Sequence, residues 1–125
     1  MPTEWKQTST IIIEIRASGM HSWPDATGIN TFLSHPHHHI FTASIELEVL
    51  DTNREIEFIA AARRFEAIFQ NELSKPRSEL ATFSCEQMAI WLAERVLYHY
   101  GTECDIKVTV REDGIHGGTY ERKKK

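Results

Sequence analysis

Apolar and polar residues alternate along three segments of the chain, and this two-residue period is typical of half-buried β-strands. The segments are residues 10–17, 40–50 and 105–111. In the first of them, Ile11, Ile13 and Ile15 share one face, while Glu14 and Arg16 lie on the other. Glycines at positions 114, 117 and 118 precede a short fourth strand, which we expect near residues 119–121.

A helical period replaces this alternation in the middle of the chain. Apolar residues recur at helical spacing at Phe58, Ala62, Phe65, Phe69 and Leu73. A second helix is predicted to begin after Ser84, whose hydroxyl can cap it while Gln87 completes a capping box. Gly101 is the expected stop of this helix. Its inner face is predicted to carry Cys85, Met88, Ala89, Leu92, Val96 and either His99 or Tyr100.

The predicted elements follow the order β-β-α-α-β-β, with one long loop at residues 18–34, where Gly, Ser, Asn, Pro and Asp are frequent. Strands at both ends with helices between them predict an α+β fold, in which two helices cover one face of a four-stranded antiparallel sheet. We expect one domain over residues 1–125. Such a sheet leaves unpaired edges, so we also expect a homo-oligomer.

Composition excludes a few classes of protein. The 125 residues are 41% hydrophobic and 26% charged, as in an ordinary globular protein. The net charge of −4 argues against non-specific nucleic-acid binding. No apolar stretch reaches the roughly 20 residues that span a bilayer, and the first residues lack the basic-then-apolar order of a signal peptide. Two cysteines without a Cys-x-x-Cys spacing favour a reducing cytoplasm.

Histidines are the first candidates for functional residues, because five of the seven lie between positions 21 and 39. His37 and His39 sit at the mouth of the second strand, and alternate strand residues share a face, so both can converge on one ion. His21 follows the first strand and supplies a third imidazole. Three histidines with an open fourth position describe a catalytic Zn²⁺ site. The alternative is a histidine-rich loop that is merely solvated.

One feature of these histidines conflicts with a regular half-buried strand. His37 and His39 share the parity of Phe41, which is the apolar side of the strand. Either the histidines precede the regular strand, or a bulge re-aims them. His35 and His38 compete as ligands but are weaker candidates, because His38 would point away from His37 and His39.

Glu112 is the second candidate. It continues the face of Val108 and Val110, so its carboxylate is expected at the end of an apolar row. A carboxylate there can accept two parallel N–H bonds from a heterocycle with an amidine-like edge, such as a pterin or guanine. The alternative interpretation is that Asp113 and Gly114 form a turn and that Glu112 only leads into it.

The segment Ser84-Cys85-Glu86 opens the second predicted helix, and backbone N–H groups at a helix N-terminus bind polar or anionic ligand atoms. These three residues are therefore candidates for substrate binding. Cys85 is also a candidate nucleophile, because helix N-termini lower thiol pKa values. The alternative for Cys85 is a small buried hydrophobe. Trp91 falls in the helical core pattern, whereas Trp23 lies in the long loop near His21, where it can face a substrate.

Four motifs in this order resemble those of the 6-pyruvoyltetrahydropterin synthase family, which includes the 6-carboxytetrahydropterin synthases of queuosine biosynthesis. The zinc histidine after the family's first strand is matched by Ala17-Ser18-Gly19-Met20-His21. The His-Gly-His-x-Tyr/Phe motif is matched by His37-His38-His39-Ile40-Phe41, with histidine in place of glycine. The Thr/Ser-rich start of the second helix is matched by Ser84-Cys85-Glu86, and the Val-x-Val-x-Glu-Thr pattern by Val108-Thr109-Val110-Arg111-Glu112-Asp113.

The resemblance covers nearly the whole chain and implies the family's tunnelling fold (T-fold). It implies zinc bound by His21, His37 and His39, and a pterin anchored by Glu112. It also implies a closed assembly of subunits, a trimer or a pair of trimers.

The chain departs from the family at two catalytic positions. The family's cysteine precedes the His-x-His motif, where this chain has Leu33 and Ser34, and the family's Asp-His pair has no match in residues 65–82. We expect a zinc-dependent, synthase-like lyase that acts on a pterin or deazapurine-type heterocycle, with His38, His35 or Cys85 as the acid or base. The alternative is a non-catalytic relative that binds a metal and a heterocyclic ligand.

Overall fold

The computed structural model describes residues 4–101 and 103–124, and its elements follow the predicted order. The strands are β1 (Ser9–His21), β2 (His37–Val49), β3 (Ile106–Glu112) and β4 (His116–Arg122). The helices are α1 (Phe58–Leu73) and α2 (Cys85–Tyr100), with short 3₁₀ turns η1 (Gly28–Ser34) and η2 (Glu79–Thr82). The four strands form one antiparallel sheet in the order β1-β2-β3-β4. The predicted α+β architecture is therefore confirmed.

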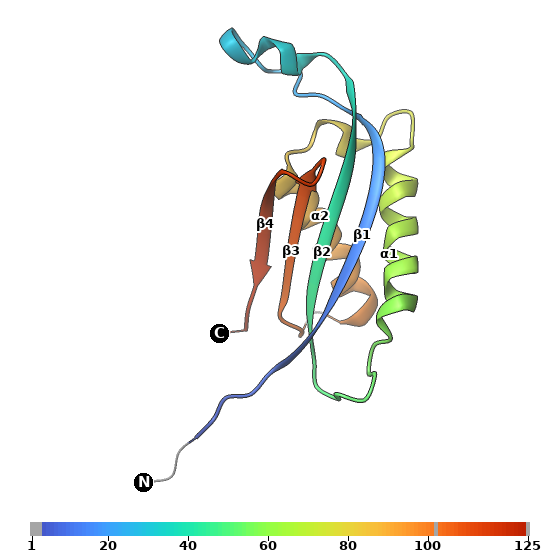
Figure 1. Cartoon of the computed structure of the whole chain (residues 1–125), viewed down its shortest axis with the longest axis vertical. Coiled ribbons are helices and arrows are strands. Elements are labelled where there is room, and N and C mark those ends of the chain that lie inside the picture. The colour runs from blue at the N-terminus through green and yellow to red at the C-terminus, as the bar shows by residue number, and fades with distance from the viewer. Residues whose placement is uncertain (1–3, 102, 125) are drawn as a thin grey trace.

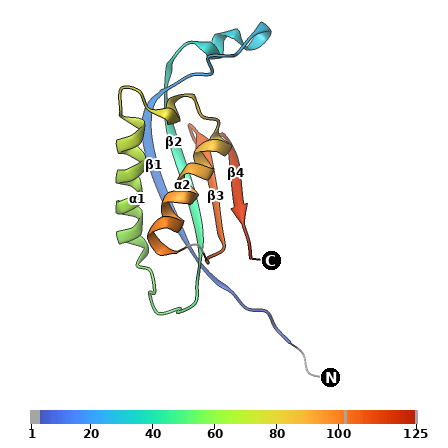
Figure 2. The same ribbon diagram turned by 180° about the vertical axis from the view of Figure 1, so that it is seen from behind.

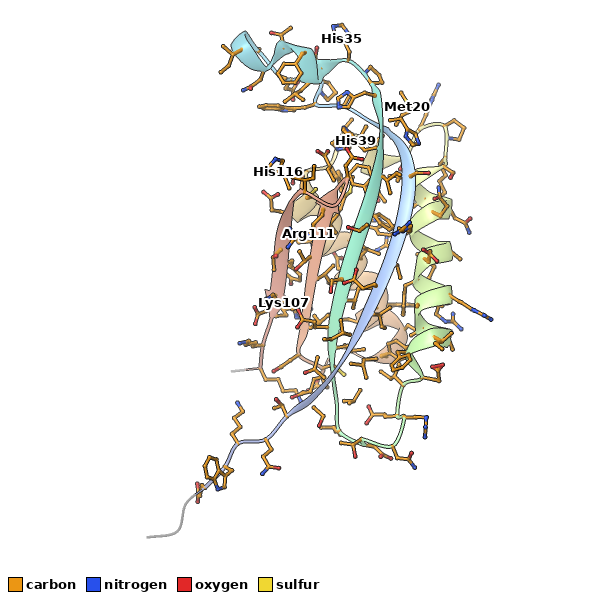
Figure 3. The ribbon with its side chains drawn as sticks, in the orientation of Figure 1. Met20, His35, His39, Lys107, Arg111 and His116 are labelled. Carbon is orange, nitrogen blue, oxygen red and sulfur yellow. The ribbon has the colours of Figure 1, made fainter. Side chains whose placement is uncertain are left out.

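The molecule has two layers, because both helices pack on the same face of the sheet (Figures 1 and 2). Helix α1 lies against β1, and α2 lies against β3 and β4. The core between the layers is apolar and includes Phe41 of β2 with Phe65 and Phe69 of α1, all fully buried. The opposite face of the sheet carries exposed charged residues, including Lys107 and Arg111 of β3 (Figure 3).

The buried stripe of α1 differs slightly from the predicted one. It steps by four residues, through Ala61, Phe65, Phe69 and Leu73. Phe58 was predicted to belong to this stripe, but it lies on its flank and is 56% exposed. Ala62 is only partly buried. Positions 58 and 62 are each one residue off the line that Ala61 begins, so they turn away from the sheet.

Helix α2 begins and ends where the sequence predicts. Ser84 caps it: the Ser84 hydroxyl accepts the Gln87 N–H at 3.1 Å, and the Gln87 side chain accepts the Ser84 N–H at 2.8 Å. Gly101 ends it with a φ of 106°, a conformation that favours glycine. Trp91 is buried, as its place in the helical core pattern predicts, and the buried face is wider than predicted because it also includes Ala93 and Leu97. Tyr100 is partly buried against the core, whereas His99 is exposed and only the edge of its ring approaches Phe65.

Strands β1 and β2 are longer than the apolar alternation indicates. They remain paired as far as His21 and His37, so Ser18 to His21 belong to a strand and not to the predicted loop. These four residues carry no apolar alternation, although their backbone continues the ladder. The rest of the connection, with η1, projects beyond the end of the sheet (Figure 1). Among the described residues, no helix is long and apolar enough to cross a bilayer.

Candidate functional site

Four side chains of the predicted site gather at the end of the sheet from which the β1–β2 connection projects. The strand register sets His21 of β1 opposite His37 of β2, and it sets Glu112 of β3 opposite Phe41 of β2. His39 lies between His37 and Phe41 on the same face of β2. The site thus draws on three neighbouring strands.

His37 and His39 lie on the same face of β2 as buried Phe41, and neither explanation that the sequence suggests for this is correct. Strand β2 is regular from His37 onward, and its pairing with β1 is continuous without a bulge. The histidines do share the face of buried Phe41, as their parity requires. What changes along the strand is the cover above this face. Phe41 lies under the helical layer and is fully buried, whereas His37 and His39 lie beyond it and are only partly buried.

The three imidazoles form one cluster with Phe41 beneath it. The ring centroids of His21 and His39 are 6.2 Å apart, and those of His37 and His39 are 4.5 Å apart. The Phe41 ring contacts His21 edge-on at 5.4 Å and His39 at 6.0 Å. Phe41 therefore links the buried core to the histidine cluster.

Glu112 joins the cluster from β3. Its Oε1 atom lies 3.4 Å from His21 Nδ1 and 4.0 Å from His39 Nε2, and its side chain is one-third exposed. The turn of the alternative interpretation is present: Asp113 and Gly114 have φ values of 51° and 72°, and Ile115 N–H donates to the Glu112 carbonyl at 3.0 Å. An Asp-Gly pair with two positive φ values is a typical hairpin turn. The turn is therefore compatible with the place of Glu112 in the histidine cluster.

Asp113 belongs to the cluster as well, although its sequence pattern indicates only a turn. Its carboxylate lies 2.7 Å from His39 Nδ1 and accepts the Ile40 N–H at 3.0 Å. The Ile40 N–H bond, followed by the His39 bond, holds the pKa of Asp113 below its usual value. The only available signal was its position, directly after the strand that ends in Glu112.

The other two histidines also have one nitrogen at a hydrogen-bond acceptor. His37 Nδ1 lies 2.7 Å from the His35 carbonyl, and His21 Nε2 lies 2.5 Å from the Phe83 carbonyl. A carbonyl can only accept, so each of these nitrogens is the donor. His37 consequently presents Nε2 as its bare nitrogen. His21 presents Nδ1, and this atom faces the Glu112 carboxylate.

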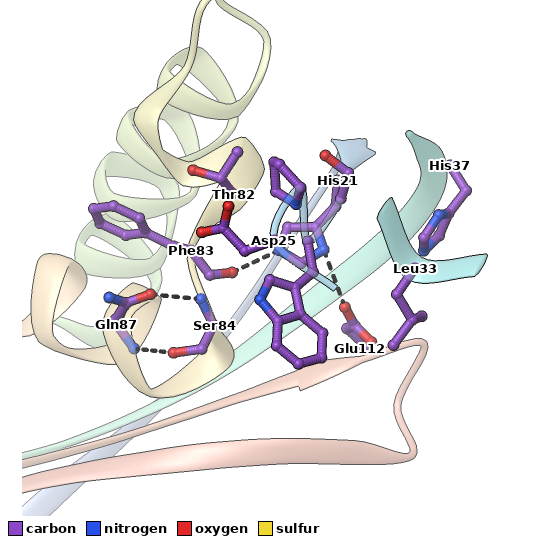
Figure 4. A pocket seen from close by; sticks show the side chains of 12 residues that line it. His21, Asp25, Leu33, His37, Thr82, Phe83, Ser84, Gln87 and Glu112 are labelled. Carbon is purple, nitrogen blue, oxygen red and sulfur yellow. Dashed lines mark hydrogen bonds and ion pairs between the residues drawn. The ribbon is translucent and has the colours of Figure 1, made fainter. Parts of the chain in front are cut away.

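A cavity of about 580 Å³ opens beside this cluster (Figure 4). This size is in the usual range for a small-molecule site. His21, His37 and Glu112 line one part of it. The predicted long loop contributes Trp23, Asp25 and Leu33, and the segment before α2 contributes Thr82, Phe83 and Ser84, with Gln87 from the helix itself. The loop therefore forms a wall of the cavity, as expected for Trp23.

Some predicted residues lie elsewhere. His38 is exposed and pairs with Met20, on the opposite face of the sheet from His37 and His39. His35 is exposed on the projecting segment (Figure 3) and lines a neighbouring hollow with His37 and His39. Glu86 packs against β4, because a Cβ on Gly118 would lie 2.5 Å from the Glu86 carboxylate. Of the three predicted residues at the start of α2, Ser84 is the one that lines the cavity.

Cys85 does not have the electrostatic surroundings of a nucleophile. Burial, followed by the negative charges of Glu112 and Glu86, raises the pKa of the Cys85 thiol from 9.0 to about 11. A helix N-terminus alone would lower the pKa of this thiol. Desolvation and two carboxylates outweigh that effect, so the thiol is neutral near pH 7.

The residues fit a zinc ion in chemistry. The Nδ1 atoms of His37 and His39 are engaged with acceptors, which leaves Nε2 of each ring to ligate. His21 Nε2 likewise donates to the Phe83 carbonyl, which leaves Nδ1 to ligate beside the Glu112 carboxylate. Within residues 4–101 and 103–124, no three His, Cys, Asp or Glu side chains already have an arrangement that could hold a metal ion. The rings would therefore have to adjust on binding.

Several solved structures share the fold, although no family model and no curated protein matches the sequence. An uncharacterized protein from Wolinella succinogenes aligns over 94% of this chain and all of its own, with a TM-score of 0.66 and 13% identity. A 6-pyruvoyl tetrahydropterin synthase from Plasmodium vivax aligns over 94% of this chain and 99% of its own, with a TM-score of 0.57 and 10% identity. The chain therefore has the T-fold of that synthase, and the resemblance found in the sequence is confirmed as a structural similarity.

Proposed function

We propose that this chain is a zinc-dependent protein of the 6-pyruvoyltetrahydropterin synthase type that acts on a pterin or deazapurine-type heterocycle. The observation that carries the proposal is the cluster of three imidazoles and Glu112, of which His21, His37 and Glu112 line a cavity of about 580 Å³. The similarity in fold to the Plasmodium vivax synthase supports it.

In this proposal His21, His37 and His39 hold the metal, which supplies a Lewis acid for a substrate oxygen when bound. Glu112 accepts hydrogen bonds from the N–H edge of the heterocycle, and the cavity walls formed by Trp23 and Leu33 exclude water from its faces. Ser84 marks the end of the cavity at the start of α2. We also propose a closed homo-oligomer, a trimer or hexamer, in the cytoplasm.

The proton donor or acceptor of such a reaction has few candidates in this chain. Cys85 is protonated near pH 7, so it can act only as an acid. His35 lies near His37 and His39 in the adjoining hollow, whereas His38 is on the other face of the sheet. His35 is thus the better placed of the two histidines.

A second function follows from the raised pKa of Cys85. Without a thiolate and without the family's Asp-His pair, the site has the groups to bind a ligand but lacks the usual groups to convert it. We therefore keep, as the second candidate, a non-catalytic T-fold protein that binds a metal and a heterocyclic ligand.

One experiment separates the two candidates. The zinc-loaded protein is titrated with a panel of pterins and guanine analogues by calorimetry, and each ligand that binds is then incubated with the protein and followed by mass spectrometry. A chemical change in a bound ligand supports the lyase. Tight binding without change supports the binding protein. The absence of both zinc uptake and ligand binding would contradict the proposal in either form.

A further inference from the structure

Asp113 connects the β3–β4 turn to the start of β2 through three hydrogen bonds. One carboxylate oxygen accepts the Ile40 N–H at 3.0 Å, and the other lies 2.7 Å from His39 Nδ1. In return, the Asp113 N–H donates to the Ile40 carbonyl at 2.7 Å. The side chain and backbone of one turn residue therefore hold both the backbone and the ring at this point of β2.

The contact determines which nitrogen of His39 carries the proton. An ionised carboxylate can only accept, so Nδ1 is the donor and the neutral ring keeps its lone pair on Nε2. That atom is the one directed to Glu112, 4.0 Å away. A ring with the opposite tautomer would place a hydrogen on Nε2 and a lone pair against the Asp113 carboxylate.

We propose that Asp113 is a positioning residue that fixes His39 as the Nδ1–H tautomer and thereby makes Nε2 available as a metal ligand. The tautomer assignment stands on the geometry of Asp113 alone, whereas its consequence for metal binding rests on the proposed function. Carboxylate partners of ligating histidines orient the ring and raise its basicity, and their loss lowers metal affinity about 10–100-fold.

The backbone at position 113 allows a clean substitution. Asp113 has a φ of 51°, in the left-handed region that asparagine also adopts readily. In Asp113→Asn, the amide oxygen can still accept the Ile40 N–H, and the amide NH₂ is then presented to His39 Nδ1. The substitution retains the turn and the hydrogen bond from the Ile40 N–H. It favours the opposite tautomer of the His39 ring, with the proton on Nε2.

The first measurement uses the metal-free protein and needs no ligand. Nitrogen-15 NMR of the imidazoles at mildly alkaline pH distinguishes the two tautomers of His39, which is assigned with a His39→Gln variant. We expect Nδ1–H in the wild type and Nε2–H in Asp113→Asn. Circular dichroism and the unfolding temperature report whether the variant is folded. A folded Asp113→Asn protein that keeps Nδ1–H would overturn the proposal.

The second measurement is zinc affinity by competition with a chelator. We expect Asp113→Asn to bind zinc about 10–100-fold more weakly than the wild type. Asp25→Asn is the control, because it removes one charge from the cavity wall without touching His39, and its effect should be smaller. In a His39→Ala background, Asp113→Asn should have no further effect. An equal loss with and without His39 would show that Asp113 does not act through that ring. Failure of the wild type to bind zinc would instead contradict the proposed function and leave the tautomer result standing.

Discussion

His21 and His37 are direct cross-strand partners at the last pair of the β1–β2 ladder. Their side chains lie on the face that holds the core, but beyond the point at which the helices cover it. The cluster therefore continues the core beyond the helices, and imidazoles take the place of apolar residues there. A single register shift would turn the side chains of one strand to the opposite face. The long, uninterrupted ladder below protects the site against that shift.

The metal prediction follows from this pairing. We expect about one zinc ion per subunit in the wild type, with three histidine ligands. The double variant His37→Ala, His39→Ala should lose it, because two of the three imidazoles come from β2. Elemental analysis after dialysis measures the content.

His38→Ala is the matched control for metal binding, since His38 lies between the two ligands in sequence but on the opposite face of the sheet. It should bind zinc like the wild type. Full zinc content in the double variant, or an equal loss in His38→Ala, would remove this site from consideration.

Much of the fold was predictable because it depends on local signals. Period-two alternation identified the first three strands, and the Ser84–Gln87 capping box located the start of α2 correctly. The ends of β1 and β2 were not predictable in the same way. Strand pairing there is carried by backbone hydrogen bonds, which leave no apolar pattern when the side chains are glycine, serine or histidine.

The placement of the candidate residues was predictable from the sequence, but their environment was not. Parity placed His37, His39 and Glu112 on one face, and the structure agrees. The helical cover that distinguishes Phe41 from His39 is a tertiary property. The same is true of the carboxylates that raise the pKa of Cys85 and of the contact between Asp113 and His39, which are 74 residues apart.

The Cys85 thiol should react slowly with alkylating reagents. Its raised pKa of about 11 leaves almost no thiolate near pH 8, so alkylation by iodoacetamide should be far slower than for an unfolded thiol. A Cys104→Ser background isolates the reaction, and mass spectrometry follows it. The rate should rise with pH and level off only near the folded pKa.

The same shift has a defined sign for stability. The folded pKa lies above the unfolded value of 9.0, so the contribution of Cys85 is fully present below pH 9 and is lost as pH rises toward 11. Cys85→Ser should weaken this alkaline loss. Rapid alkylation near pH 7 would instead support the thiolate that the sequence suggested.

Phe41 should be the main structural support of the site. It is fully buried, and its ring contacts His21 and His39. Phe41→Ala should lower the free energy of unfolding by about 3–5 kcal/mol, through lost burial and the cavity left behind. Urea unfolding at one fixed protein concentration measures it. Phe58→Ala is the control, since Phe58 is 56% exposed, and a similar loss there would contradict the assignment.

The oligomer prediction concerns the sheet edges. Strands β1 and β4 are the two edge strands of the subunit, and unpaired edges favour association with further copies. Light scattering should give about 43 kDa for a trimer or about 86 kDa for a hexamer, from a subunit of 14.4 kDa. A monomer at micromolar concentration would contradict this prediction.

Glu112 is predicted to anchor the heterocycle, and this is the sharpest test of the proposed ligand class. A carboxylate facing two N–H groups accepts two parallel hydrogen bonds, whereas glutamine brings a donor against one of them. Because the side chain is one-third exposed, we expect Glu112→Gln to lose about 2 kcal/mol, which is roughly a 30-fold weaker affinity. Zinc content and oligomeric state should not change. Glu86→Gln is the control, since Glu86 packs against Gly118 of β4 and lies outside the cavity lining. Calorimetry with pterins and guanine analogues makes the measurement. If the wild type binds none of them, or if Glu112→Gln binds as tightly as Glu86→Gln, Glu112 is no ring anchor and serves only to lead β3 into the Asp113–Gly114 turn.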